Sequence, residues 1–534
     1  MKSFSKLLIL SSVFVLLFAS GCKKQKGLAS GNTILPLGGK SHTTGWSYND
    51  PEQGFFNVQT EYYGKCPKGM VYIPVSTTVR GQNSDMLSVA KNNMKKRVAT
   101  SAFYMDETEV TNLDWREYVR WLQGIYGDTF PEVVVRALPD ETVWRRELAY
   151  NEPYVREYYV SPAFNHYPVV GVSWVQATEY CKWRTDRLNE LELIHAGIIP
   201  FVPLEVANLM FKEDPDSIKN FVFTTKYARD YVWYVNTYYE DFADEEGEAI
   251  QFTPDYASFD LNGDGEIARN EWHIALEGVL YDSECRLPTE IEWEYAAWGL
   301  LTDEGIYSQT NTYPWAGDQL RSFDESYTEG LFLANFLRGR GDPVGVQMNG
   351  TLTMPVSSFL PNDYGLFDMS GNVNEWVKDV YRANVNVVEE INAYRGNEFE
   401  SDSLYAEEIL TKHFDYLSPE KRDSMRTVLI LERGITKTGG DYRNFKDGDR
   451  QSSVDSTKTM IDEYKLMQPI EMANAISNTA RVYKGGGWND RAIWLNPAQR
   501  RWLDERQSRN DIGFRCVMSS VGGNEHVREQ DNNY

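Results

Sequence analysis

The residues whose types and spacing could bind a metal ion lie between Asp260 and Glu271. Oxygen-bearing side chains occupy the first, third, fifth and twelfth positions of this segment, and Gly265 occupies the sixth. This spacing wraps oxygens around a hard cation, the glycine allows the sharp turn, and the seventh residue supplies a backbone carbonyl. The alternative is an acidic turn that binds no ion. We predict a structural calcium site with the ligands Asp260, Asn262, Asp264, Glu266 and Glu271.

The other residue types that serve in catalysis are scattered along the sequence. There is no pair of histidines at metal-ligand spacing, no Gly-x-Ser-x-Gly turn and no Gly-x-x-x-x-Gly-Lys loop. Each isolated histidine is therefore interpreted as a surface or packing residue. The six histidines are His42, His166, His195, His273, His413 and His526.

The N-terminal segment has the pattern of a bacterial lipoprotein signal. A basic start precedes an apolar run over residues 7–19, which is too short to span a bilayer, and small residues precede Cys22. We predict that residues 1–21 are a signal peptide and that Cys22 is acylated. The alternative is an ordinary secretory peptide that is cut near Ala19 to Gly21 and is followed by an incidental cysteine. Residues 22–65 then form a lipidated tether. Because no acidic run follows Cys22, we expect an outer-membrane protein that is anchored by lipid and faces the periplasm.

Three junctions between an apolar stretch and a helix would position the functional side chains. A strand is predicted at 69–74, and another begins at Phe103 and leads into the first helix. Each helix start is marked by a hydroxyl residue with a carboxylate or amide three residues later, which is the pattern of an N-terminal capping box. These junctions indicate a loop-rich α+β domain. The three pairs are Thr111 with Asp114, Ser173 with Gln176, and Thr289 with Glu292.

Length and charge restrict the function further. The chain has 534 residues, and 42% of them are hydrophobic, which is enough for a sizeable core. Its 78 acidic and 54 basic residues give a formal charge of −24. Nucleic-acid binding depends on clustered lysine and arginine, and the basic run that follows the signal peptide, Lys23, Lys24 and Lys26, is short. The composition therefore argues against a nucleic-acid partner.

Several longer motifs, in this order, resemble the formylglycine-generating-enzyme family, also called the sulfatase-modifying-factor fold. The resemblance implies an α+β, C-type-lectin-related, loop-rich domain over about residues 66–520, with long insertions at 184–285 and 380–480 and a polar tail at 521–534. The first insertion contains the predicted calcium loop. The matching motifs lie at 168–183, 286–299, 313–318, 334–335, 355–376 and 481–516.

The resemblance also indicates where catalytic residues would lie. Enzymes of this family oxidise a cysteine of sulfatases with a copper-binding pair of cysteines that follows a glycine-rich segment. In this sequence the segment is 485–487, and Asp490 and Leu495 occupy the positions of the two cysteines. Neither side chain supplies the soft thiolate that Cu(I) prefers or a redox-active sulfur. We therefore expect a pseudoenzyme with no catalytic residues and no copper.

The family's structural calcium sites have counterparts in the sequence. One would use the side chains of Asp368 and Glu375 with the backbone carbonyls of Gly371 and Val373. A further site would begin with Asn335 and the carbonyl of Phe336.

The resemblance also pairs cysteines. It implies a disulfide between Cys181 and Cys516, which an extracytoplasmic compartment permits. Cys66 and Cys285 are then left as a second pair by elimination.

The lipid signal and several segments resemble, within this fold, the gliding-motility lipoproteins of Bacteroidetes. That resemblance implies a non-catalytic structural or assembly component of the gliding and type IX secretion machinery, with other proteins of the machinery, including a paralogous lipoprotein, as partners. Two alternatives are an oxidative metalloenzyme of the same fold with changed chemistry and a carbohydrate-binding lipoprotein. The segments lie at 44–46, 103–112, 141–145, 149–152 and 183–187.

Overall fold

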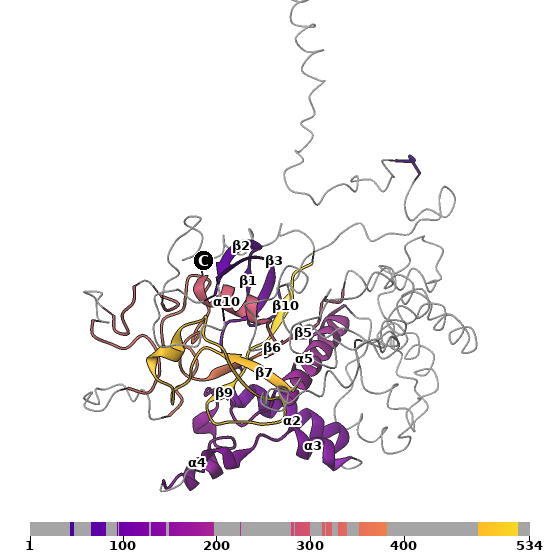
Figure 1. The fold of residues 1–534 in the computed structure, drawn as a ribbon. Helices are drawn as coiled ribbons and strands as arrows, with labels where there is room; N and C mark the ends of the chain where they lie inside the picture. Colours follow the sequence, from indigo (N-terminus) through magenta and orange to yellow (C-terminus); the bar gives the residue numbers. More distant parts are fainter. Residues whose placement is uncertain are drawn as a thin grey trace, which may run out of the picture. The chain divides into compact units, whose positions relative to one another are not determined.

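Three small β-sheets and a group of helices form the described part of this computed structural model (Figure 1). Nearly all described residues belong to one compact unit, which comprises residues 66–252 and 281–520. The described residues are 43–46, 66–81, 93, 95–127, 130–145, 149–196, 225, 279–281, 283–299, 312–315, 317–322, 329–338, 352–381 and 479–521.

The first sheet joins the start, middle and end of the unit. Its strands are antiparallel and run in the order β1 (Met70–Ile73), β4 (Phe103–Asp106), β10 (Val517–Ser519) and β5 (Cys285–Arg286). All four side chains of β4 are buried, because the strand lies inside the sheet and both of its faces are covered. The strand expected at 69–74 is confirmed as β1.

The second sheet carries the glycine-rich segment at the end of one of its strands. Its order is β8 (Arg501–Asp504), β7 (Ala480–Lys484), β6 (Asn374–Val380) and β9 (Ile512–Gly513), and only the pairing of β6 with β9 is parallel. The third sheet is the hairpin of β2 (Ser76–Arg80) with β3 (Lys96–Thr100).

Two helices cover one side of the core. In α2 (Asn112–Tyr126) the buried residues recur at helical spacing, and α5 (Trp174–His195) lies beside it (Figure 1). The ring of Trp115 stacks on that of Tyr180 with their centroids 5.3 Å apart. Most described tryptophans are buried in this way, as expected for core residues rather than for a glycan-binding surface. The buried ones are Trp115, Trp144, Trp174, Trp293, Trp298, Trp376 and Trp488.

All three predicted capping boxes are confirmed. They begin α2, α5 and α10 (Glu290–Trp298), and in each the N-cap hydroxyl accepts from the N3 backbone amide while the N3 side chain accepts from the N-cap amide. The remaining short helices are α3 (Pro131–Ala137), η1 (Glu141–Trp144), α4 (Glu152–Glu157), η2 (Pro162–Phe164) and η10 (Ala492–Leu495). This mixture of separate helices and mainly antiparallel strands is an α+β architecture.

The two predicted insertions leave the domain at well-defined places. Helix α5 continues beyond Arg184 to His195, and the returning chain is bonded to the same helix, because the Tyr281 amide donates to Asn189 Oδ1 at 2.9 Å. The second insertion leaves between two paired strands, since the Tyr381 amide donates to the Ala480 carbonyl at 2.7 Å.

Cys22 and the predicted calcium loop from Asp260 to Glu271 lie outside the described residues. Among the residues that the structure describes, no helix combines the length and the apolar character needed to cross a membrane.

Candidate functional site

The glycine-rich segment forms a turn directly after β7. Gly485 and Gly486 have φ values of 95° and 72°, in the left-handed region that favours glycine. A Cβ atom on Gly486 would lie 2.8 Å from the Trp494 carbonyl oxygen. The turn therefore requires glycine, and it brings the chain back so that residues 490–495 pack against β6 and β8.

Asp490 lies in this turn and forms an ion pair with Arg501. Its carboxylate accepts two hydrogen bonds from Arg501, at 2.7 Å and 2.6 Å, one from the Gly487 amide at 2.9 Å and one from Asn374 Nδ2 at 2.9 Å. Burial by itself would raise the pKa of Asp490, but the hydrogen bonds and charge of Arg501 outweigh it, and the pKa lies below its usual value. The position predicted for the first family cysteine therefore has an ionised carboxylate with a fixed partner.

Leu495, at the position predicted for the second family cysteine, has an apolar side chain. It is fully buried and packs with Tyr313, Phe332, Ala334 and Phe336. Its carbonyl accepts a 2.6 Å hydrogen bond from Ser370 Oγ. The arrangement of an ion pair and an apolar contact offers no thiol or thiolate, so cysteine-based copper chemistry has no ligands at these two positions.

Replacing Asp490 with asparagine is expected to cost roughly 3 kcal/mol at neutral pH, because the guanidinium of Arg501 would lose its counter-charge. Since the folded-state pKa of Asp490 is lowered, its contribution is fully present above about pH 4 and is lost as the pH falls through the folded-state pKa. Urea unfolding from pH 7 to pH 3 should show a shallower acid loss for the variant than for the wild type. Parallel pH profiles would contradict this role; Asp363→Asn, at an exposed position, is the control.

A second cluster of charged residues surrounds Glu375 of β6. Arg515 donates to both carboxylate oxygens of Glu375, at 2.7 Å and 2.8 Å, and Trp293 Nε1 donates to Glu375 Oε2 at 2.7 Å. Glu109 and Asp368 complete the cluster, so that three buried carboxylates surround one guanidinium.

The excess of negative charge in this cluster contributes to raised pKa values of two of its carboxyl groups. Burial and the nearby Glu375 raise the pKa of Asp368 to about 7. Burial, followed by the charges of Asp368 and Glu375, raises the pKa of Glu109 well above its usual value. A cation at this place would offset the excess, which is the first observation in favour of the predicted calcium site.

The backbone around Asp368 also fits a cation site. Asp368, Gly371 and Asn372 have φ values of 57°, 93° and 58°, and a Cβ atom on Gly371 would lie 2.7 Å from the Asn335 carbonyl oxygen. Glu375 Oε1 accepts one hydrogen bond and keeps a lone pair for a metal ion. Asp368 and Glu375, with the carbonyls of Gly371 and Val373, would hold calcium as a structural ion.

The residues predicted for the neighbouring site lie beside the first. Asn335 Nδ2 donates to the Leu352 carbonyl at 2.9 Å, and the Asn335 carbonyl accepts from the Asn372 amide at 2.9 Å. Phe336 is buried in the cluster around Leu495. Among the described residues no three histidine, cysteine or acidic side chains form a metal-binding group, so these sites depend on backbone carbonyls and amide oxygens as well.

Calcium titration calorimetry on chelator-treated protein should detect both predicted kinds of site. Asp264→Ala is expected to remove binding at the loop between 260 and 271, because it deletes the ligand at the fifth position. Asp368→Asn is expected to weaken the other site, because it removes one of the two charged ligands, whereas Asp363→Asn should bind like the wild type. A titration that neither Asp264→Ala nor Asp368→Asn changes would refute the assignments.

The cysteines predicted to pair are neighbours in the core. Cys181 Sγ lies 3.3 Å from Cys516 Sγ, so the structure has two thiols in contact rather than the bond of about 2.05 Å that the prediction requires. Cys66 and Cys285 are also thiols and pack in the same core cluster. Burial raises the pKa of Cys285 to about 12, which makes this thiol unreactive as a nucleophile.

Both disulfides stay predictions that a thiol assay tests. The mature protein, purified without reductant and denatured, should release no free thiol if both bonds form, and two if only Cys181 and Cys516 are joined. Reduction should expose all four. Four thiols before reduction would exclude both disulfides.

Sequence reasoning missed the partners that give the site its charge balance. Arg501 and Arg500 are adjacent on the chain, and their side chains go to Asp490 and Glu290 respectively. Arg501 is the first residue of β8 and Arg500 immediately precedes it, so the two side chains reach different partners although they are neighbours in the sequence. Glu109 and Arg515 carried no local signal, since both act on residues far away in the sequence.

Some proteins of similar sequence are named formylglycine-generating enzymes, and others are named as inactive forms. The formylglycine-generating enzyme of Streptomyces coelicolor is 34% identical over 129 residues, covering 24% of this chain and 36% of that protein. The Bos taurus enzyme is 23% identical over 332 residues, covering 61% and 62%. The inactive Cα-formylglycine-generating enzyme 2 of Bos taurus is 39% identical over 99 residues, covering 18% and 28%.

The chain thus matches less than two thirds of the length of each of these relatives. The model of the family described as sulfatase-modifying factor enzyme 1-like domain matches residues 58–429 of this chain, which is more than half of its length. Together with the described α+β architecture, this match shows that the chain belongs to the family of formylglycine-generating, sulfatase-modifying-factor domains.

Proposed function

We propose that this protein is a non-catalytic member of its family that acts as a structural or assembly component. The observation that carries the proposal is the chemistry at the two family cysteine positions, where Asp490 is neutralised by Arg501 and Leu495 is fully buried. Neither position can form a disulfide or bind copper through sulfur. The existence of relatives that are named inactive supports a non-catalytic role.

The cellular setting follows from the N-terminal signal. With Cys22 acylated, the domain would be anchored to the outer membrane and face the periplasm, with calcium as a structural ion. The sequence resembles the gliding motility lipoprotein GldJ of Bacteroidetes, which supports a place in the gliding and type IX secretion machinery. Its partners would be other proteins of that machinery, including a paralogous lipoprotein.

The second insertion is the first segment to test for partner binding. Because Tyr381 and Ala480 are hydrogen-bonded neighbours at the ends of β6 and β7, residues 382–478 can be replaced by a short hairpin turn. Thr479 is kept, since its hydroxyl donates to Asp504 at 2.6 Å. We expect the shortened protein to keep its thermal unfolding transition.

Affinity purification from detergent-solubilised outer membranes, followed by mass spectrometry, tests the role. The wild type should capture proteins of the secretion machinery, and the shortened protein should lose them. Elemental analysis of the same preparation should find calcium and no copper or iron. Copper or iron in stoichiometric amount, or oxidation of a sulfatase cysteine peptide by the purified protein, would refute the non-catalytic assignment.

A further inference from the structure

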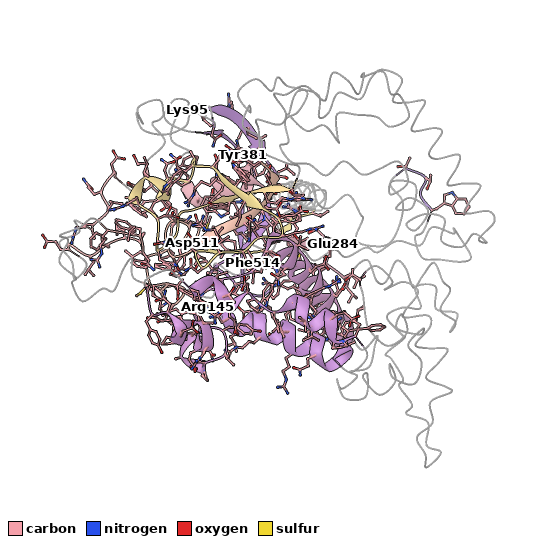
Figure 2. The ribbon with its side chains drawn as sticks, turned by 60° about the horizontal axis from the view of Figure 1, so that its bottom comes forward. Lys95, Arg145, Glu284, Tyr381, Asp511 and Phe514 are labelled. Atoms are coloured by element: carbon pink, nitrogen blue, oxygen red, sulfur yellow. The ribbon has the colours of Figure 1, made fainter. Side chains whose placement is uncertain are left out.

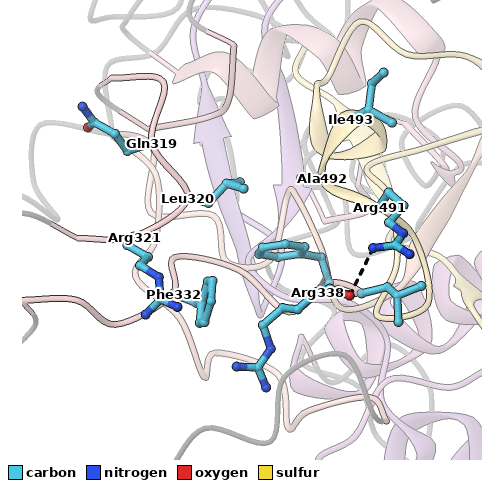
Figure 3. A pocket seen from close by; sticks show the side chains of 10 residues that line it. Gln319, Leu320, Arg321, Phe332, Arg338, Arg491, Ala492 and Ile493 are labelled. Carbon is cyan, nitrogen blue, oxygen red and sulfur yellow. Dashed lines mark hydrogen bonds between the residues drawn. The ribbon is translucent and has the colours of Figure 1, made fainter. Parts of the chain in front are cut away.

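A cavity of about 610 Å³ lies beside the vestigial cysteine positions. It is bounded by the short helix η10 (Ala492–Leu495) and by two loop segments, 319–321 and 332–338 (Figure 3). Its size is in the range of ordinary ligand pockets. The cavity is separate from the carboxylate cluster described above, and no residue of the predicted calcium sites other than Phe336 lines it.

Three arginines line the cavity in a protein of net charge −24. The guanidinium of Arg321 lies over the Phe332 ring at 3.9 Å from its centroid, and that of Arg338 lies at 4.9 Å from the same centroid. Arg491 donates to the Arg338 carbonyl at 3.2 Å, as Figure 3 shows. Stacking and hydrogen bonding hold these long side chains in place, which lowers the entropy that a ligand would have to remove.

Apart from Gln319, the other described residues that line the cavity are apolar. Leu320, Leu337 and Ile493 contribute aliphatic side chains, and Phe332 lies between two of the guanidiniums. Guanidiniums bind carboxylates through paired hydrogen bonds, and the aliphatic wall suits an apolar neighbour of that carboxylate. Arginine and aromatic side chains next to apolar surface are also the composition of the energetic centres of protein interfaces.

We propose that this cavity binds an acidic, partly apolar peptide segment of a partner protein. The long-range charge of the molecule favours such a ligand over a polyanion: a net charge of −24 repels nucleic acid or an anionic membrane, whereas a single carboxylate inside the cavity is within a Debye length of about 8 Å of the arginines. The inference deepens the proposed assembly role, because it names a surface and the chemistry of its partner.

Fluorescence anisotropy on the full mature chain in detergent tests the proposal. The probe is a fluorescein-labelled, leucine-rich peptide with a single glutamate, and its counterpart carries glutamine in place of that glutamate. We expect the glutamate peptide to bind at least about tenfold more tightly, because each charge-assisted hydrogen bond contributes more than a neutral one. Its affinity should fall as salt is added.

The variant Arg321→Gln/Arg491→Gln should lose about tenfold in affinity for the glutamate peptide. The control Arg120→Gln/Arg156→Gln changes the net charge equally at exposed positions on α2 and α4, and should bind like the wild type. Equal losses in both variants would show general charge attraction and overturn the proposal. Binding to phosphatidylglycerol vesicles that exceeds binding to phosphatidylcholine vesicles, and that Arg321→Gln/Arg491→Gln removes, would also overturn it, in favour of a lipid ligand; the comparison with phosphatidylcholine corrects for the lipid anchor.

The test is separable from that of the assembly role. If the cavity variant binds the peptide like the wild type while the wild type still captures its partners from membranes, only the cavity assignment fails. If the peptide binds as expected but no partner is captured, the assembly role fails and the cavity remains an anion site.

Discussion

Replacing Arg515 with methionine is expected to lower the free energy of unfolding by roughly 3 to 5 kcal/mol. Arg515 is completely buried, and it is the guanidinium that faces Glu109, Asp368 and Glu375. It also donates to the Phe367 carbonyl at 2.8 Å and to the Asp106 carbonyl at 3.1 Å. Methionine can fill much of the volume, but it leaves three buried carboxylates with no positive charge between them.

Urea unfolding at pH 7 measures this loss, with Arg506→Met at an exposed position as the control. Arg515→Lys should lie between methionine and the wild type, because an ammonium keeps the charge but cannot bind both oxygens of Glu375 with a planar fork. Added calcium should recover part of the stability of Arg515→Met if the carboxylates bind the ion. An unchanged urea midpoint for Arg515→Met would show that the cluster is protonated or solvated and needs no counter-charge.

Replacing Lys484 with methionine should destabilise the protein by a similar amount, roughly 3 to 5 kcal/mol. Lys484 lies at the end of β7 with no exposed side-chain surface, and its ammonium is 2.5 Å from Glu294 and 3.2 Å from Glu290. Arg500, also fully buried, is 2.5 Å from Glu290. The four side chains are balanced when all are ionised, so the removal of one cation leaves an uncompensated negative charge inside the core.

A double-mutant cycle separates this charge effect from a loss of packing. Glu294→Gln removes the matching negative charge, so Lys484→Met/Glu294→Gln should be destabilised by less than the sum of the two single variants. Additive losses would mean that Lys484 stabilises through its aliphatic chain alone. The exposed replacement Lys182→Met, on α5, controls for the general effect of a lost lysine.

The local features of the fold were predictable because their causes lie within a few residues. Each capping box is a reciprocal pair of bonds between positions three apart, so Thr111, Ser173 and Thr289 mark helix starts in any context. The pattern of β1 was equally clear, since an apolar run ended by proline leaves few alternatives. The end of α5 was less predictable: no local stop signal follows Arg184, and the helix continues for three further turns.

The lipid signal and the calcium loop are predictions from the sequence alone, whereas the capped helix starts were predicted from it and are confirmed. That residues 490 and 495 are Asp490 and Leu495 rather than cysteine is also known from the sequence. The ion pair of Asp490 could not be predicted from the sequence, because Asp490 lies in the turn after β7 whereas its partner Arg501 lies on β8. The same holds for Glu375 and Arg515, which are 140 residues apart. It also holds for the arginines around the cavity beside η10 (Figure 3). Figure 2 draws the described side chains on the ribbon. Local hydrogen bonds can be predicted from spacing, whereas the pairing of buried charges depends on which strands the fold makes neighbours.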